Sequence, residues 1–137
     1  MENNSFRKFL DFYLEVWRNS SLTDLKNIIS KDYKAREISS GELVDFGYEE
    51  SIIGWEQGFN FAKENKWDLN EISIIPLRED EFMAILSATL VIGGKKLENV
   101  SLFFQTFKKK ENDDWNLIRS YIETGVPNDN VKKIQCN

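Results

Sequence analysis

The stretch from residue 81 to residue 124 decides the fold, because it contains three long strands joined by a turn and a loop. The strands are EFMAILSATLVI (81–92), LENVSLFFQTFKK (97–109) and WNLIRSYIET (115–124), with Gly93-Gly94 and a polar loop between them. Runs rich in β-branched and aromatic residues, separated by turn residues, are typical of an antiparallel meander. The chain is therefore predicted to end in a sheet.

The strand at 81–92 is apolar on both of its faces. Phe82, Ala84 and Leu86 point to one side, and Met83 and Ile85 point to the other. An antiparallel strand with one face in water should alternate apolar with polar residues. One face is expected to cover helices, and the other to be covered by a second copy in a homodimer packed sheet to sheet. The alternative is that the long strands curl around their own core.

Helical patterns precede the meander. Apolar residues recur at spacings of three and four from Phe6 to Arg18, as an amphipathic helix requires. A shorter helix is predicted to start at the N-cap Ser21 and end at Lys31-Asp32. The rest is expected to form strands at Tyr33–Ile38 and Leu43–Phe46, a helix at Tyr48–Glu64, and a strand at Asp68–Arg78, where Pro76 indicates a position at the margin of the sheet.

Composition limits the possible functions. The 137 residues suit one domain, with a polar tail at 127–137, and the net charge of −5 without a long basic cluster excludes nucleic acid as an expected partner. There is no histidine, so His-based triads and His-ligated metals are excluded, and no motif indicates a metal or a cofactor. A single cysteine, Cys136, and the lack of a long apolar run predict a cytoplasmic protein without a membrane span.

The order of elements resembles that of the nuclear transport factor 2-like superfamily, which includes ketosteroid isomerases and SnoaL-like polyketide cyclases. The resemblance covers residues 6–126, and its most specific parts are FLDFYLEVW (9–17) and WNLIRSY (115–121). It implies an α+β fold in which three helices cap a strongly curved, mixed or antiparallel sheet to form a cone. Small molecules enter such cones at the open end.

The resemblance also suggests roles for three residues. The tyrosine that donates to a developing oxyanion in ketosteroid isomerases corresponds to Tyr13, and the general base corresponds to Glu37. The protonated acid that completes the oxyanion hole corresponds to Phe103, which can donate nothing. A complete isomerase site is therefore not implied, although an isomerase, cyclase or dehydratase that uses Glu37 and Tyr13 remains an alternative.

Several other side chains are candidates for lining the cone, with core packing as the alternative for each aromatic one. Arg119 lies mid-strand between Leu117 and Tyr121, on the face that we expect all three to share. If that face is interior, a carboxylate ligand or Glu123 could pair with Arg119; if it is exterior, Arg119 is an ordinary surface charge. The candidate ligand-binding residues are Tyr13, Trp17, Tyr33, Trp55, Phe59, Phe103, Gln105, Arg119 and Tyr121.

Three functions remain possible from the sequence. The first is a small-molecule-binding protein with an aromatic-lined cone that holds an apolar or aromatic ligand. The second is the enzyme that uses Glu37 and Tyr13. The third is a protein interaction module whose cone is filled by side chains.

Overall fold

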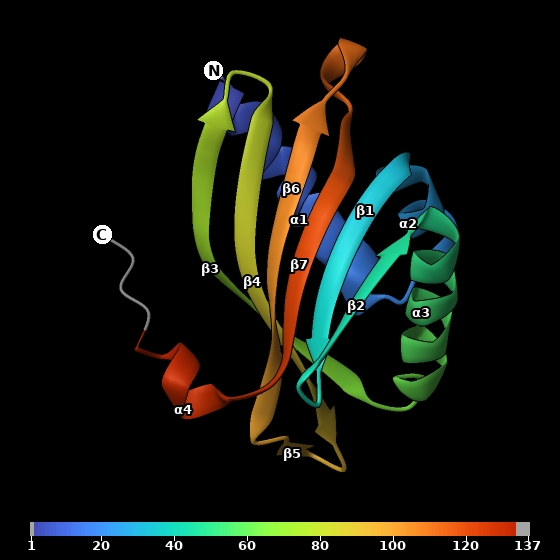
Figure 1. The fold of residues 1–137 in the computed structure, drawn as a ribbon, viewed down its shortest axis with the longest axis vertical. Coiled ribbons are helices and arrows are strands. Elements are labelled where there is room, and N and C mark those ends of the chain that lie inside the picture. Colours follow the sequence, from blue (N-terminus) through green and yellow to red (C-terminus); the bar gives the residue numbers. More distant parts are fainter. Residues whose placement is uncertain (1, 134–137) are drawn as a thin grey trace.

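The computed structural model describes residues 2–133, which form one sheet and four helices (Figure 1). Cys136 and the end of the predicted tail lie outside the described residues. The helices are α1 (Glu2–Arg18), α2 (Leu22–Ile28), α3 (Tyr48–Phe61) and the short α4 (Asn128–Val131). The strands are β1 (Ile29–Ser39), β2 (Glu42–Gly47), β3 (Lys66–Arg78), β4 (Glu81–Ile92), β5 (Lys95–Lys96), β6 (Asn99–Lys109) and β7 (Trp115–Pro127).

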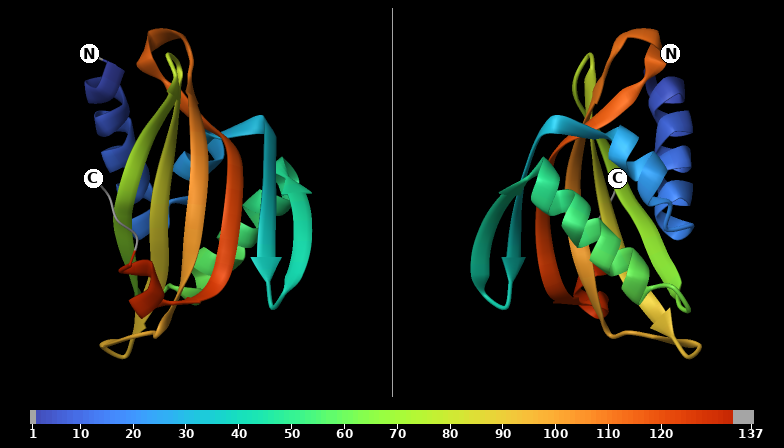
Figure 2. Two further views of the ribbon diagram at one scale, coloured as in Figure 1. Left: turned by 60° about the vertical axis from the view of Figure 1, so that its left-hand side comes forward. Right: turned by 90° about the vertical axis from the view of Figure 1, so that its right-hand side faces the viewer.

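The strands form a mixed sheet in the order β2-β1-β7-β6-β4-β3, and β5 pairs with β4. The pairing of β1 with β7 is parallel, and the other pairings are antiparallel. The sheet bends strongly, and α1, α2 and α3 lie over its concave side (Figure 2). The predicted α+β architecture is thus confirmed. The margin position indicated by Pro76 is also confirmed, because β3 is an outer strand whose register shifts between Pro76 and Arg78.

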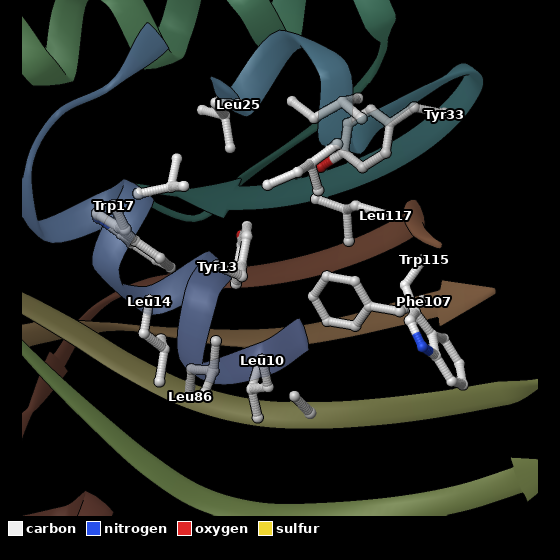
Figure 3. Close-up of a cluster of buried hydrophobic side chains, with 14 of the residues drawn as sticks. Leu10, Tyr13, Leu14, Trp17, Leu25, Tyr33, Leu86, Phe107, Trp115 and Leu117 are labelled. Carbon is white, nitrogen blue, oxygen red and sulfur yellow. The ribbon is translucent and has the colours of Figure 1, made fainter. Parts of the chain in front are cut away.

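Helix α1 packs tightly on the concave face, with buried residues from Phe6 to Trp17. Phe6 stacks on Phe82 with ring centroids 4.8 Å apart, and Tyr13 meets Phe107 edge to face at 5.2 Å. Figure 3 shows Leu10 and Tyr13 of α1 pointing toward the strands beneath them. Each fully buried side chain of this size contributes roughly 1.5–3 kcal/mol by leaving water. We call the region around Phe6, Tyr13, Phe107 and Trp115 the packed end.

A bulge in β7 changes which residues face inward. Phe107 pairs with Leu117, but the preceding residue Thr106 pairs with Arg119, so Ile118 is an extra residue in β7. An extra residue turns all subsequent side chains to the opposite face. Leu117 is therefore fully buried, whereas Arg119 faces outward. The expectation that Arg119 shares a face with Leu117 is wrong for this reason.

Several predicted boundaries also differ. The second helix ends at Ile28 rather than at Lys31-Asp32, and β1 begins at Ile29 rather than at Tyr33. The third helix ends at Phe61 rather than at Glu64, and residues 128–131 of the predicted tail form α4, in which Val131 is buried. The start of α3 follows from local chemistry, because the Glu50 carboxylate accepts a hydrogen bond from the Gly47 backbone N–H at 3.1 Å. Within residues 2–133, none of the helices has the length and apolar character to cross a membrane.

Candidate functional site

A cavity of about 490 Å³ lies between α3 and the concave face of the sheet. We call it the α3 cavity. Its walls come from the end of α1, from α3 and from strands β1, β2, β3, β4, β6 and β7. The lining residues are Trp17, Tyr33, Glu37, Val44, Asp45, Phe46, Glu50, Ser51, Gly54, Trp55, Gly58, Trp67, Ala88, Ser101, Phe103, Gln105 and Ile122.

Aromatic side chains form one wall and hold one another in place. The ring centroid of Trp17 lies 4.8 Å from that of Trp55, 5.0 Å from that of Phe103 and 5.9 Å from that of Trp67, all edge to face. Such pairs contribute about 0.5–1.5 kcal/mol each beyond the area that they bury. Because Trp17 is only 1% exposed, the other rings pack against a fixed partner. The wall is therefore preorganised.

Glu37 interrupts an apolar row on the inner face of the sheet. The register aligns Leu86, Phe103, Ile122, Glu37 and Val44 across five strands, so a carboxylate occupies a place among hydrophobic side chains. Burial raises the pKa of Glu37 above its ordinary value. Within residues 2–133 no hydrogen bond or ion pair to its carboxylate is found. Glu37 is thus a partly desolvated carboxylate that lines the α3 cavity and has no partner among the described residues.

A chain of buried hydrogen bonds runs beneath the cavity. The Tyr13 hydroxyl donates to Gln105 Oε1 at 2.7 Å, and Gln105 Nε2 donates to Ser120 Oγ at 3.3 Å. The Tyr33 side chain is buried beside Ser120 and Ser51, and this burial raises the pKa of its hydroxyl to about 12. Burial likewise raises the pKa of Tyr13 well above its ordinary value. These groups satisfy one another, so the Gln105 amide is already occupied at both ends.

The structure brings some of the predicted site residues together. Glu37, Trp17, Tyr33, Trp55, Phe103 and Gln105 line the α3 cavity. Phe59 packs on Trp55 with centroids 5.5 Å apart but belongs to the core, and Tyr13 lies below the cavity with no exposed surface.

Arg119 and Tyr121 lie on the convex face of the sheet. Arg119 Nη2 is 3.3 Å from Glu81 Oε1, and the Tyr121 hydroxyl donates to Glu123 Oε1 at 2.7 Å. Both residues line a shallow hollow on that face and not the α3 cavity. The bulge in β7 is the physical reason, because it turns Arg119 and Tyr121 away from the helices.

Sequence reasoning missed several lining residues. Trp67 lies just before the predicted start of its strand, and Ser51 lies on the buried side of α3. Gly54 and Gly58 were missed although their spacing of four residues places both on one side of a helix. That spacing within an otherwise helical pattern was the available signal.

A second hollow, of about 760 Å³, lies beyond the packed end, between α1, α2 and the loop before β7. Its lining mixes Lys8 and Lys110 with Asp24, Asp113 and Asp114. Charges of both signs surround it, and its aromatic lining is limited to Phe9, Trp115 and the half-exposed Phe12. The α3 cavity is therefore the better candidate for a ligand site.

The strongly curved sheet, with three helices over its concave face, defines the class of this protein. The chain has the nuclear transport factor 2-like, or cystatin-like, fold. No family model matches the sequence, and no curated protein matches it either. Solved structures do resemble it. A domain of unknown function with a cystatin-like fold from Nostoc punctiforme is 12% identical, with a TM-score of 0.69, over 96% of this chain and 82% of that one.

Two further solved structures have a similar fold. An NTF-2 like protein of unknown function from Shewanella oneidensis is 14% identical, with a TM-score of 0.67, over 90% of this chain and 99% of that one. Another from Silicibacter pomeroyi is 14% identical, with a TM-score of 0.64, over 88% and 93%. At such identities the likeness shows the fold alone, and one fold hosts many functions.

Proposed function

We propose that this protein binds a small, largely apolar or aromatic molecule in the α3 cavity, as a SnoaL-like member of the nuclear transport factor 2-like superfamily. The volume of about 490 Å³ lies within the range of ligand sites, and the walls combine several aromatic rings with a few polar groups. An open cavity at this place favours binding over the alternative of an interaction module with a filled cone.

Two glycines in the middle of α3 carry this proposal. Gly54 and Gly58 line the cavity, and a Cβ added to either would meet no atom within 4 Å. Neither has the positive φ that would require glycine. Each costs the helix about 1 kcal/mol relative to alanine. Neither packing nor backbone geometry requires glycine at these two positions. We propose that glycine is present there because it leaves space in the cavity for a ligand.

Filling that room tests the proposal. We expect the neutral fluorophore N-phenyl-1-naphthylamine to bind the wild type with a rise in its emission and quenching of tryptophan fluorescence. Gly54→Leu and Gly58→Leu should abolish binding, because both positions line the cavity and a leucine there would occupy part of its volume. Gly54→Ala and Gly58→Ala are the matched controls and should retain it. Equal binding by the leucine variants, measured at equal folded fraction, would place the probe elsewhere and refute the proposal.

Catalysis by a carboxylate base is the second candidate, and the position of Glu37 favours it. Its raised pKa and its place on the cavity wall suit proton abstraction beside a carbonyl. A mechanism that also uses Tyr13 as the oxyanion donor is disfavoured, because the Tyr13 hydroxyl already donates to Gln105 and does not line the cavity. Base-dependent exchange of an α-proton of a bound ketone for deuterium, lost in Glu37→Gln, would support this candidate; no exchange with a bound ketone would eliminate it.

We also propose that the protein is a cytoplasmic homodimer that pairs through the convex face of the sheet. Met83, Phe104 and Tyr121 form an apolar hollow there, flanked by Arg119 and Asp45. A patch that carries both charge signs can be complementary to itself across a two-fold axis. Sedimentation should give twice the monomer mass for the wild type and the monomer mass for Phe104→Glu. A wild-type monomer at high concentration would refute the dimer.

A further inference from the structure

We propose that the ligand of the α3 cavity carries a positive charge, as an organic ammonium group seated between Glu37 and the aromatic wall. This inference rests on the proposed function and names the chemical class of its ligand. It depends on three features of the cavity: the sign of the charges that line it, the absence of a partner for the Glu37 carboxylate within residues 2–133, and the aromatic rings in its walls.

The charged groups that line the α3 cavity are all acidic. They are Glu37, Asp45 and Glu50, and none of the lining residues is a lysine or an arginine. The nearby Arg36 pairs with Asp45 through Nε at 2.7 Å and Nη2 at 2.9 Å. The positive charge of Arg36 is therefore already paired with a carboxylate. An anionic ligand would therefore meet repulsion without a compensating cation.

Glu37 differs from the other two carboxylates because nothing within residues 2–133 neutralises or hydrogen-bonds it. Asp45 has Arg36, and Glu50 accepts the Gly47 N–H. A neutral apolar ligand would displace the water around Glu37 and leave its charge unsolvated, which is unfavourable. An ammonium ligand would replace that water with an opposite charge.

The aromatic wall suits the same ligand. Trp17, Trp55, Trp67 and Phe103 all line the cavity that Glu37 faces. Tryptophan offers the strongest ring face for a cation, and cages of aromatic rings recognise quaternary ammonium groups. Trp55, Trp67 and Phe103 each pack against the buried ring of Trp17, so the aromatic wall is held in place before a ligand arrives.

Matched probes can isolate the charge. We would titrate the protein with (1-naphthylmethyl)trimethylammonium, with the neutral isostere in which carbon replaces nitrogen, with 1-naphthylmethanol and with 1-naphthylacetate, and follow tryptophan quenching. The quaternary ammonium has no N–H, so its preference reports charge and not hydrogen bonding. We expect it to bind roughly tenfold more tightly than the isostere, and the acetate to bind most weakly.

Variants then assign the preference to one residue. Glu37→Gln should reduce the preference for the ammonium to about twofold or less while the isostere binds as before or better. Glu42→Gln is the matched control, since Glu42 is exposed on β2 and does not line the cavity, and it should retain the full preference. Higher salt should weaken binding of the ammonium probe and not that of the isostere.

The outcomes separate the two proposals. If the isostere binds as tightly as the ammonium in the wild type, or Glu37→Gln keeps the preference, the ligand charge is wrong while binding in the cavity stands. If the alcohol binds as tightly as the ammonium and loses affinity in Glu37→Gln, Glu37 is an acceptor for a neutral donor and the inference is overturned. If no probe binds, both the inference and the proposed function fail.

Discussion

The two ends of the concave face use the same kind of residue for different purposes. At the packed end, Phe6, Tyr13 and Phe107 fill the space between α1 and the sheet. Beneath α3, Trp55, Trp67 and Phe103 surround a cavity. Aromatic composition therefore does not distinguish a core from a binding site. The difference lies in the covering helix, because α1 fills its end with large side chains, whereas α3 lines the cavity with Gly54 and Gly58 as well as with Trp55.

Truncating one phenylalanine at the packed end and one beside the α3 cavity should give the largest difference in stability between the two ends. Phe107→Ala should lower the free energy of unfolding by about 3–5 kcal/mol, because Phe107 is fully buried among rings on several sides. Phe103→Ala should cost no more than about 2 kcal/mol, since one side of Phe103 already borders empty space. Urea denaturation measures both. Equal losses would mean that the two ends are packed alike.

The buried hydrogen bonds that separate the two ends should give the next largest effect. Tyr13→Phe removes the donor to Gln105 and leaves a buried amide oxygen unpaired, at a cost of about 1–3 kcal/mol. Combining it with Gln105→Leu in a double-mutant cycle should recover part of that loss. Tyr48→Phe is a suitable control, because no hydrogen bond to its hydroxyl is found within residues 2–133. A Tyr13→Phe variant as stable as that control would show that the bond contributes nothing.

The glycines of α3 should respond in the opposite direction. Gly54→Ala and Gly58→Ala should each raise the free energy of unfolding by about 0.5–1 kcal/mol, because alanine restricts the unfolded chain and the new methyl group meets open space. Gly94→Ala is the contrasting variant and should destabilise, since Gly94 has a φ of +80°. Thermal denaturation measures the relative stabilities of these variants and of the wild type. Loss of stability in both α3 variants would argue that the cavity is filled in solution.

The smallest effect should appear as a difference in pH dependence between Glu37 in the cavity and Asp45 at its rim. Burial raises the folded-state pKa of Glu37 above 4.5, so the folded protein binds a proton more tightly than the unfolded chain. Its contribution to stability is present below pH 4.5 and is lost as the pH rises through the folded-state pKa. Glu37→Gln should therefore gain stability relative to the wild type as the pH rises from 4 to 7.

Asp45 has the reverse sign. Its hydrogen bonds with Arg36 lower its pKa below 3.8, so it stabilises the folded state above that pH, and the contribution is lost as the pH falls through the folded-state pKa. Asp45→Asn should be less stable than the wild type at pH 7 and approach it in acid. Urea midpoints across the pH range test both carboxylates. Parallel curves for the two variants would contradict the assigned environments.

Much of the fold follows from local patterns in the sequence. The spacing of Phe6, Phe9 and Tyr13 predicted α1, the turn at Gly93-Gly94 separated two strands, and Pro76 predicted the margin of the sheet. The placement of Arg119 did not follow, because Ile118 shifts the register by one residue and nothing in the strand pattern marks the bulge. Trp67 escaped notice because it lies at a strand end, where alternation gives little information.

By itself, the sequence determined the order of the elements and which aromatic residues of α1 face the sheet, because periods of 3.6 and 2 residues are local properties of the chain. Only the tertiary structure decided that Arg119 faces outward, that Glu37 joins the inner row between Ile122 and Val44, and that α3 leaves a cavity where α1 leaves none. These features depend on strand register and on the distance between layers. Both are set by contacts between residues far apart in the chain, which a local pattern does not contain.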